Sequence, residues 1–138
     1  MEQAYFRIHP IGKVEKRDGS VRLRILEAYE PALVGLEGFS HMHVFWWFDK
    51  NDTPAKRGIL QVHPRGEKRN PLTGVFATRA PVRPNLIAMD LCAIGGIRGG
   101  VVEVDKIDAF DGTPILDIKP YIPGSDAVVG EVRVPDWL

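Results

Sequence analysis

Apolar residues occur only in short runs along this chain, and glycine, proline or aspartate bounds the runs. The 14 glycines and 11 prolines make up 25 of the 138 residues. Because a glycine or proline costs the interior of an α-helix about 1 to 3 kcal/mol, this content excludes a bundle of long helices. Short strands at this spacing predict an all-β barrel or sandwich with at most short helical turns. Beyond residue 50, the predicted strands are 59–63, 74–78, 86–94, 101–107 and 115–118.

Two features near the start of the chain predict how the sheet begins. Residues 11–16 and 21–26 form the arms of a hairpin, because the Asp18-Gly19 pair between them accepts the positive φ angles of a tight turn. Residues 41–48 carry aromatic side chains on both faces, which predicts a strand at the centre of the sheet that is buried on both sides. Between them, residues 29–39 have room only for a short helix or turn.

The length of 138 residues predicts a single domain, residues 1–138. The one cysteine, Cys92, cannot close an internal disulfide, and no secretory leader follows Met1, so we expect a cytoplasmic protein. No run approaches the roughly 18 apolar residues of a membrane span, and we expect no membrane partner.

Charge is balanced overall but not along the chain. Lys plus Arg and Asp plus Glu both total 18. Residues 56–85 hold seven basic residues and one acidic residue, whereas residues 101–138 hold three basic and eight acidic residues. The basic segment could therefore meet a phosphate backbone. Alternatively, the two segments lie side by side and neutralise each other.

The segment 74–85 reads Gly-Val-Phe-Ala-Thr-Arg-Ala-Pro-Val-Arg-Pro-Asn. Pro81 and Pro84 restrict the backbone, so Arg79 and Arg83 are expected on a stiff loop that leaves a strand. Guanidinium groups bind carboxylate or phosphate with two parallel hydrogen bonds, and a rigid loop reduces the entropy lost on binding. The segment predicts an anion site, although an ordinary proline-stiffened connection has the same pattern.

The segment 108–121 combines a turn at Asp111-Gly112 with a strand that begins at Pro114. Along that strand, Asp117, Lys119 and Tyr121 fall on one face by the period of two. A carboxylate, an ammonium and a phenol side by side can tune one another's proton affinity, which favours acid and base chemistry. The alternative is a surface salt bridge.

Two other kinds of site are not supported by the pattern. His41, His43 and His63 have no recognisable third ligand at metal-site spacing, so we expect no metal. The glycines in 94–100 do not match the dinucleotide-binding pattern and predict a hairpin turn instead.

Taken together and in this order, the two segments resemble the TrmO family, also called TsaA-like. The family pattern GVFATRSPxRPNPIG stands here as GVFATRAPVRPNLIA (74–88), and DGTPVLDIKPY stands as DGTPILDIKPY (111–121). Residues 36–41 and 63–66 are also similar to family segments, so the resemblance spans about residues 8–125. It implies a single antiparallel β-barrel, a homodimer with the cofactor site near the subunit interface, and methyl transfer from S-adenosylmethionine to a modified adenosine in transfer RNA.

The resemblance also implies roles for individual residues. It places the proton acceptor at Asp111 or Asp117, with Lys119 and Tyr121 to tune or orient it. It implies a cofactor site formed by Asp49, Lys50, Phe76, Thr78, Arg79, Arg83, Asn85, Asp111, Gly112, Thr113 and Pro114. Transfer RNA is expected to bind at Arg65, Lys68 and Arg69.

The chain departs from the family pattern at positions that matter for the site. Leu86 stands in place of proline, Ala88 in place of glycine, and Asp90 in place of a hydroxyl residue. Asp49 follows the aromatic strand where the family often has histidine. These changes affect the identity of the acceptor more than cofactor binding, so two alternatives stay open. One is a related methyltransferase that acts on a small molecule, and the other is a module that binds S-adenosylmethionine without transferring methyl.

Overall fold

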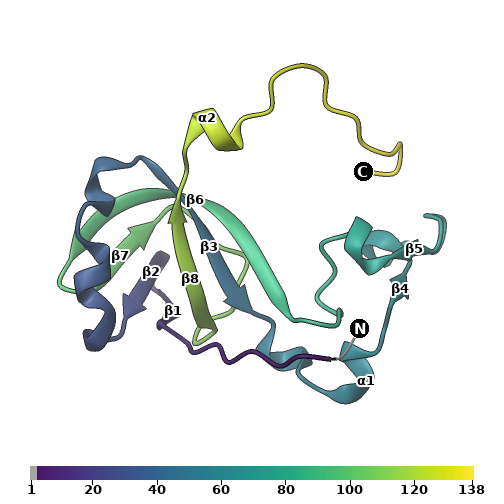
Figure 1. The fold of residues 1–138 in the computed structure, drawn as a ribbon, viewed down its shortest axis with the longest axis horizontal. Coiled ribbons are helices and arrows are strands. Elements are labelled where there is room, and N and C mark those ends of the chain that lie inside the picture. Colours follow the sequence, from purple (N-terminus) through teal and green to yellow (C-terminus); the bar gives the residue numbers. More distant parts are fainter. Residues whose placement is uncertain (1–2) are drawn as a thin grey trace.

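The computed structural model describes residues 3–138, and its main body is a closed antiparallel barrel (Figure 1). The strands follow one another around the barrel in the order β1, β2, β7, β6, β3 and β8. Each strand pairs with its neighbour in antiparallel register, and β8 closes the barrel against β1. The bounds are Gly12–Arg17 for β1, Ser20–Ile25 for β2, His41–Trp47 for β3, Ile87–Arg98 for β6, Val101–Val104 for β7 and Pro114–Pro120 for β8. The expected all-β barrel is confirmed.

The hairpin and the short helical segment also form as expected. Arg17 pairs with Ser20 at the end of β1 and β2. Asp18 and Gly19 between them have φ angles of 50° and 79°, which is the geometry that the Asp-Gly pair favours. The segment 29–39 is mostly covered by two 3₁₀ helices, Glu27–Leu33 and Leu36–Gly38, with a turn between them.

Strand β3 lies at the centre of the barrel wall, between β6 and β8. Met42, Val44 and Trp46 point into the core and are at most 6% exposed. The side chains that alternate with them are only half-buried, because the outer face of the barrel has no second layer. The expectation of burial on both sides is therefore correct for one face only.

The core fills the barrel with aliphatic side chains from all six strands and from the loop before β8. Among them, Leu23, Met42, Cys92 and Ile115 are fully buried. Burial raises the pKa of the Cys92 thiol to about 12. The thiol is therefore protonated at neutral pH and is not available as a nucleophile.

Three predicted elements differ from the structure. Strand β4 is only Gln61–Val62, and it pairs with β5, Thr73–Gly74, outside the barrel. Of the run 74–78, only Gly74 belongs to a strand, because Val75–Ala77 forms a 3₁₀ helix. The glycine-rich segment 94–100 is mostly strand, and only Gly99 and Gly100 make the turn. A β-bulge lies between Ile94 and Ile97, and a Cβ at Gly95 would lie 3.2 Å from Glu103 on β7, so glycine permits this close approach.

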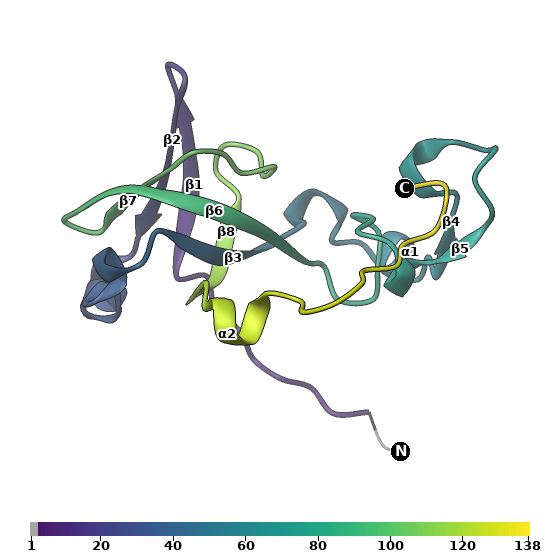
Figure 2. The same cartoon turned by 90° about the horizontal axis from the view of Figure 1, so that it is seen from above.

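Residues 52–85 form a small lobe that stands apart from the barrel in both ribbon views (Figures 1 and 2). The lobe contains the short helix α1, Pro54–Arg57, and the strands β4 and β5. After β8, the helix α2, Pro123–Asp126, leads into an extended C-terminal segment. No helix within residues 3–138 is both long and apolar enough to cross a membrane.

Candidate functional site

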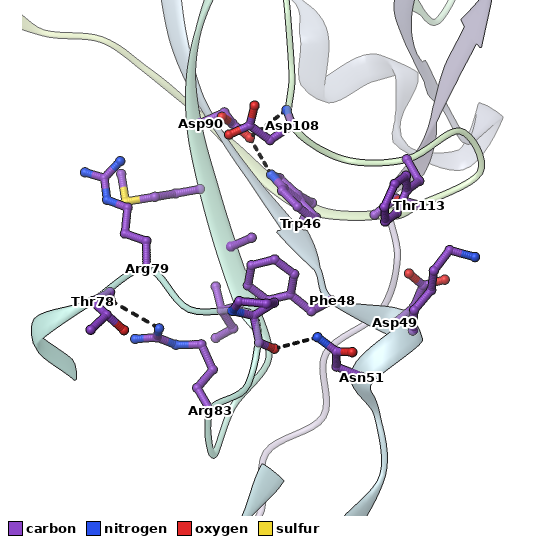
Figure 3. Close-up of a pocket in the computed structure, with 16 residues that line it drawn as sticks. Trp46, Phe48, Asp49, Asn51, Thr78, Arg79, Arg83, Asp90, Asp108 and Thr113 are labelled. Atoms are coloured by element: carbon purple, nitrogen blue, oxygen red, sulfur yellow. Dashed lines mark hydrogen bonds between the residues drawn. The ribbon is translucent and has the colours of Figure 1, made fainter. Parts of the chain in front are cut away.

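A pocket of about 600 Å³ lies where one end of the barrel meets the lobe. This volume is in the usual range of small-molecule sites. The ends of β3 and β6, the turn 49–51, the loop 78–83 and the loop 108–113 supply its walls (Figure 3). The lining residues are Trp46, Phe48, Asp49, Lys50, Asn51, Thr78, Arg79, Pro81, Arg83, Ile87, Ala88, Met89, Asp90, Asp108, Phe110 and Thr113.

The loop that carries the two arginines is fixed by its own hydrogen bonds. Thr78 Oγ1 accepts the Ala80 N–H at 3.1 Å and donates to the Val75 carbonyl at 2.9 Å. The Arg83 guanidinium donates to the backbone carbonyls of Thr78 and Ala80 at 3.3 and 3.1 Å. Arg83 therefore holds the loop in shape, whereas the neighbouring Arg79 is exposed at the pocket and makes no hydrogen bond to the described residues. This geometry leaves Arg79 as the guanidinium that can receive an anion.

Side chains from the opposite wall attach the loop to the end of β3. The Asn51 side-chain amide donates to the Pro81 carbonyl at 3.1 Å. Arg57 on α1 donates through Nε to the Pro84 carbonyl at 2.9 Å, and one of its terminal nitrogens lies 3.4 Å from the Asn85 side-chain oxygen. Asn85 is thus tied to Arg57 and does not line the pocket. These contacts indicate that the pocket is formed before any ligand binds.

Two carboxylates lie side by side at the inner end of the pocket (Figure 3). The Trp46 indole N–H donates to Asp90 Oδ2 at 2.7 Å, and the Asp108 backbone N–H lies 3.4 Å from the same oxygen. Burial raises the pKa of the Asp90 carboxyl, and the charge of Asp108 raises it further. The Trp46 hydrogen bond and the charge of Arg79 oppose this rise in pKa without cancelling it.

The segment 108–121 reaches the pocket through its turn at Asp111-Gly112. Thr113 lines the pocket and is 2% exposed. Gly112 has a φ of 83° and donates its N–H to the Val14 carbonyl at 2.7 Å, while Asp111 Oδ1 accepts the Lys16 backbone N–H at 2.8 Å. Asp111 and Gly112 therefore attach the turn to β1, and neither lines the pocket.

The structure does not bring Asp117, Lys119 and Tyr121 to this pocket. The Asp117 carboxylate accepts the N–H of its neighbour Ile118 and borders a separate apolar pocket of about 370 Å³. Tyr121 packs near the rings of two histidines on β3. No hydrogen bond or ion pair links these three side chains within residues 3–138. Their predicted joint role in acid and base chemistry gains no support from this arrangement.

The remaining predicted residues are divided between the pocket and the lobe. Asp49 and Lys50 line the pocket, and Lys50 Nζ lies 5.8 Å from the centroid of the Phe110 ring. Phe76 is 83% exposed and lies outside the pocket lining. Pro114 begins β8 behind the turn. Arg65, Lys68 and Arg69 are exposed on the lobe, where Arg69 pairs with Glu67 at 3.2 Å.

Three important lining residues were not among the predicted site residues: Trp46, Asp108 and Phe110. The aromatic run of β3 was expected only to support the pocket. Asp108 and Phe110 immediately precede the DGTP motif, and this proximity is the signal that could have pointed to them. The sequence distinguishes Asp90 only as a departure from the family pattern. Within residues 3–138, no group of three or more His, Cys, Asp and Glu side chains could hold a metal ion.

Comparison with known proteins gives matches over most of the chain. A family model described as the tRNA-methyltransferase O N-terminal domain matches residues 7–127. A probable S-adenosyl-L-methionine-binding protein of Methanocaldococcus jannaschii is 46% identical over 116 residues, which is 84% of this chain and 92% of that protein. A protein of Pyrococcus horikoshii with the same description is 45% identical over 116 residues, which is 84% of this chain and 82% of that protein.

Two further matches are longer than this chain. The human tRNA (adenine(37)-N6)-methyltransferase is 42% identical over 109 residues, which is 78% of this chain but only 24% of the human protein. The crystal structure of TrmO from Pseudomonas aeruginosa superposes with a TM-score of 0.71 at 29% identity, and the match covers 94% of this chain and 62% of that chain. The likeness therefore covers only a part of each of these larger proteins.

Proposed function

Because the chain belongs to the tRNA-methyltransferase O N-terminal domain family, we propose that it transfers a methyl group from S-adenosyl-L-methionine to an adenine of transfer RNA. The acceptor that we propose is the exocyclic nitrogen of threonylcarbamoyl-adenosine next to the anticodon, in the cytoplasm. The observation that carries the proposal is the meeting of both family-like motifs at one pocket. Arg79 from the first motif and Thr113 from the second line the same cavity, although 34 positions separate them in the sequence.

The chemistry of the lining residues fits S-adenosyl-L-methionine. This ligand has an adenine ring, a sulfonium and an amino-acid end that carries an ammonium and a carboxylate. Trp46, Phe48 and Phe110 supply aromatic walls suited to the ring. The Asp49 carboxylate suits the ammonium, and the free guanidinium of Arg79 suits the carboxylate.

When bound, S-adenosyl-L-methionine supplies an electrophilic methyl carbon, and the chain must bring a nitrogen to it. The exocyclic nitrogen of the proposed acceptor is a weak nucleophile, because its lone pair is conjugated with the purine and with a carbonyl. Alignment within about 3 to 3.5 Å is therefore the main requirement. The loop fixed by Thr78 and Arg83 and the wall fixed by Asn51 supply rigid surfaces for such alignment, since both are held by hydrogen bonds within the chain.

The lobe supports transfer RNA as the acceptor. Its exposed basic residues include Arg65, Lys68 and Arg69, and the Arg69 side chain is 82% exposed. Within the described part of the chain, no ion pair links the basic segment 56–85 to the acidic segment 101–138. The positive charge of the basic segment is therefore not neutralised by direct pairing with the acidic one. Phosphate contacts of this kind position a nucleic acid without reading its sequence.

A second candidate function is a module that binds S-adenosyl-L-methionine without transferring methyl to RNA. The observation that favours it is the description of the two archaeal relatives at 46% and 45% identity as probable binding proteins only. A related methyltransferase with a small-molecule acceptor is the other alternative, and the carboxylate of Asp90 in place of a hydroxyl favours it.

One experiment separates these functions. The purified chain is incubated with methyl-labelled S-adenosyl-L-methionine and bulk transfer RNA, and the RNA is then digested and its nucleosides are analysed by mass spectrometry. We expect label in a methylated threonylcarbamoyl-adenosine. Donor binding by calorimetry without label in any nucleoside would refute transfer to RNA. Release of the demethylated donor with a metabolite extract would then identify a small-molecule enzyme, and its absence would identify a binding module.

We also propose a homodimer. In the C-terminal segment, Val128, Val129 and Val132 are 70%, 98% and 70% exposed, and such apolar surface favours contact with a second copy. Light scattering at micromolar concentration should give twice the monomer mass. A monomer mass under these conditions would contradict the proposal.

A further inference from the structure

Asp90 occupies an unusual position for a carboxylate. On β6 it follows the period of two that places Ala88 and Cys92 in the barrel core, where they are 7% and 0% exposed. Asp90 is half-buried and lines the pocket at its inner end. A core-facing carboxylate loses hydration, and this loss destabilises the folded state unless hydrogen bonds compensate for it. The position therefore calls for a reason beyond packing.

The hydrogen bonds of Asp90 are distributed unevenly between its two oxygens. Oδ2 accepts the Trp46 indole N–H at 2.7 Å, and the Asp108 backbone N–H lies 3.4 Å from it. No described residue donates a hydrogen bond to Oδ1. These two contacts to Oδ2 fix the orientation of the carboxylate and leave Oδ1 without a donor among the described residues. Because Asp90 lines the pocket (Figure 3), we expect a bound group to reach this oxygen.

The other two candidate carboxylates lack this arrangement. Asp111 uses Oδ1 to accept the Lys16 backbone N–H at 2.8 Å, and Asp117 accepts the N–H of Ile118 at 2.9 Å. Neither residue lines the pocket. Asp108 lines the pocket but is exposed, and its backbone N–H is directed to Asp90. Of the three carboxylates that line the pocket, Asp49 and Asp108 are exposed, whereas Asp90 is half-buried and is oriented by hydrogen bonds to one oxygen.

We propose that Asp90 receives the N–H of the methyl acceptor through Oδ1 and takes its proton during methyl transfer. This inference rests on the proposed function and assigns its base. As the acceptor nitrogen forms its bond to the methyl carbon with its lone pair, the carbon–sulfur bond breaks and its electron pair stays on sulfur. The N–H proton passes to Oδ1, and the electron pair of that bond stays on nitrogen. The products are a neutral methylated nitrogen, a neutral thioether and a protonated Asp90.

This role agrees with the surroundings of Asp90. Burial and the charge of Asp108 raise the pKa of the carboxyl, so it is a stronger base than an ordinary aspartate, while Arg79 and the Trp46 indole limit the rise. The hydroxyl that the family pattern carries at this position could accept the same hydrogen bond, but it is too weak a base to hold the proton. The contact also selects the substrate class, because the acceptor must present an N–H to Oδ1. A nitrogen without hydrogen, such as the methylated product, loses this contact.

The test compares Asp90→Asn with a matched control, Asp105→Asn. Asp105 is an aspartate outside the pocket lining whose Oδ1 accepts the Ala93 N–H at 2.8 Å. In single-turnover reactions with saturating donor and transfer RNA, Asp90→Asn should react 100- to 10,000-fold more slowly than the wild type. Asp90→Ser should also lose at least tenfold, and Asp105→Asn should stay within threefold. The affinity of the Asp90 variants for S-adenosyl-L-methionine should stay within threefold by calorimetry.

A second readout does not depend on turnover. In protein labelled with ¹³C-aspartate, the Asp90 carboxyl signal is the one that is missing in Asp90→Asn. It should titrate above the ordinary aspartate value of 3.8 and should shift when S-adenosyl-L-methionine binds. An unshifted titration without any response to the donor would overturn the proposal.

Three kinetic results have different meanings. If the wild type methylates RNA and Asp90→Asn stays within threefold of it, Asp90 is not the base and only this inference fails. If Asp90→Asn instead loses more than tenfold in donor affinity, Asp90 is a donor-binding residue, and the inference also fails. If the wild type binds the donor but methylates no RNA, the proposed function fails, and the assignment of Asp90 as the base for it fails as well.

Discussion

Replacing Trp46 with phenylalanine should show how strongly the indole holds Asp90. Trp46 is 6% exposed, and its N–H donates to Asp90 Oδ2 at 2.7 Å. The loss of a hydrogen bond to a charged group costs about 1.5 to 3 kcal/mol. Phenylalanine still packs on Phe48, whose ring centroid is 4.8 Å away, but the smaller ring leaves a gap worth about 1 kcal/mol. We expect the free energy of unfolding at pH 7 to fall by about 2.5 to 4 kcal/mol.

The pH dependence of this effect has a definite sign. Burial raises the pKa of Asp90 in the folded chain, so folding favours the protonated carboxyl. The stability that protonation of Asp90 provides is fully present below the pKa that this carboxyl has in the unfolded chain. It is lost as the pH rises through the folded pKa. The indole hydrogen bond opposes this loss because it is strongest to the ionised carboxylate. The effect of Trp46→Phe should therefore be largest at neutral pH and should shrink in acid.

The assay is urea unfolding of four proteins: the wild type, Trp46→Phe, Asp90→Ala and the double variant. The double-mutant cycle isolates the interaction between the two side chains from the packing loss of each substitution. We expect a coupling free energy of at least about 1 kcal/mol at pH 7. A coupling below about 0.5 kcal/mol would refute the view that the indole fixes the Asp90 carboxylate.

Other variants test the loop, the turn and the lobe. Arg79→Ala should weaken S-adenosyl-L-methionine binding by about 10- to 100-fold at an unchanged urea midpoint. Arg83→Ala should weaken binding and also lower the free energy of unfolding by about 1 kcal/mol, because it frees the loop carbonyls. Equal behaviour of the two variants in both assays would contradict their separate roles. Asp111→Ala should lower the thermal midpoint, since the Lys16 N–H loses its partner, and an unchanged calorimetric midpoint would contradict this. The double variant Lys68→Ala with Arg69→Ala should reduce the salt dependence of transfer RNA affinity by about two in log–log slope, with unchanged donor affinity. An unchanged slope would exclude the lobe as a phosphate site.

Features of the fold that depend on local chemistry could be predicted from the sequence. The Asp18-Gly19 turn sets its own φ angles, and the alternation of β2 places Leu23 in the core. The wrong predictions depend on which segments pair in the folded chain. Strand β6 runs through Gly95 because β7 folds back closely against it, and the glycine-rich composition of 94–100 does not show that the turn is confined to Gly99 and Gly100. The 3₁₀ helix Val75–Ala77 begins where the Val75 N–H donates to the Leu60 carbonyl, another distant contact.

The candidate site shows the same division. Motif positions located Arg79 and Thr113, because those segments reach the pocket directly. The pairing of β3 with β6 and the path of the chain after β7 bring Trp46, Asp90 and Asp108 together, and sequence spacing does not contain this information. Asp111 stands in a recognisable motif, yet the structure gives its carboxylate a backbone partner on β1 instead of a place in the pocket.

Methyl transfer to an adenine of transfer RNA can be followed on the modified nucleoside itself. Transfer RNA that carries threonylcarbamoyl-adenosine is incubated with the purified chain and S-adenosyl-L-methionine, and the digested nucleosides are analysed by mass spectrometry. We expect this nucleoside to gain one methyl group on its exocyclic nitrogen and Asp90→Asn to abolish most of the gain. Transfer RNA recovered without any methyl gain, from a protein that binds the donor, would contradict the claim.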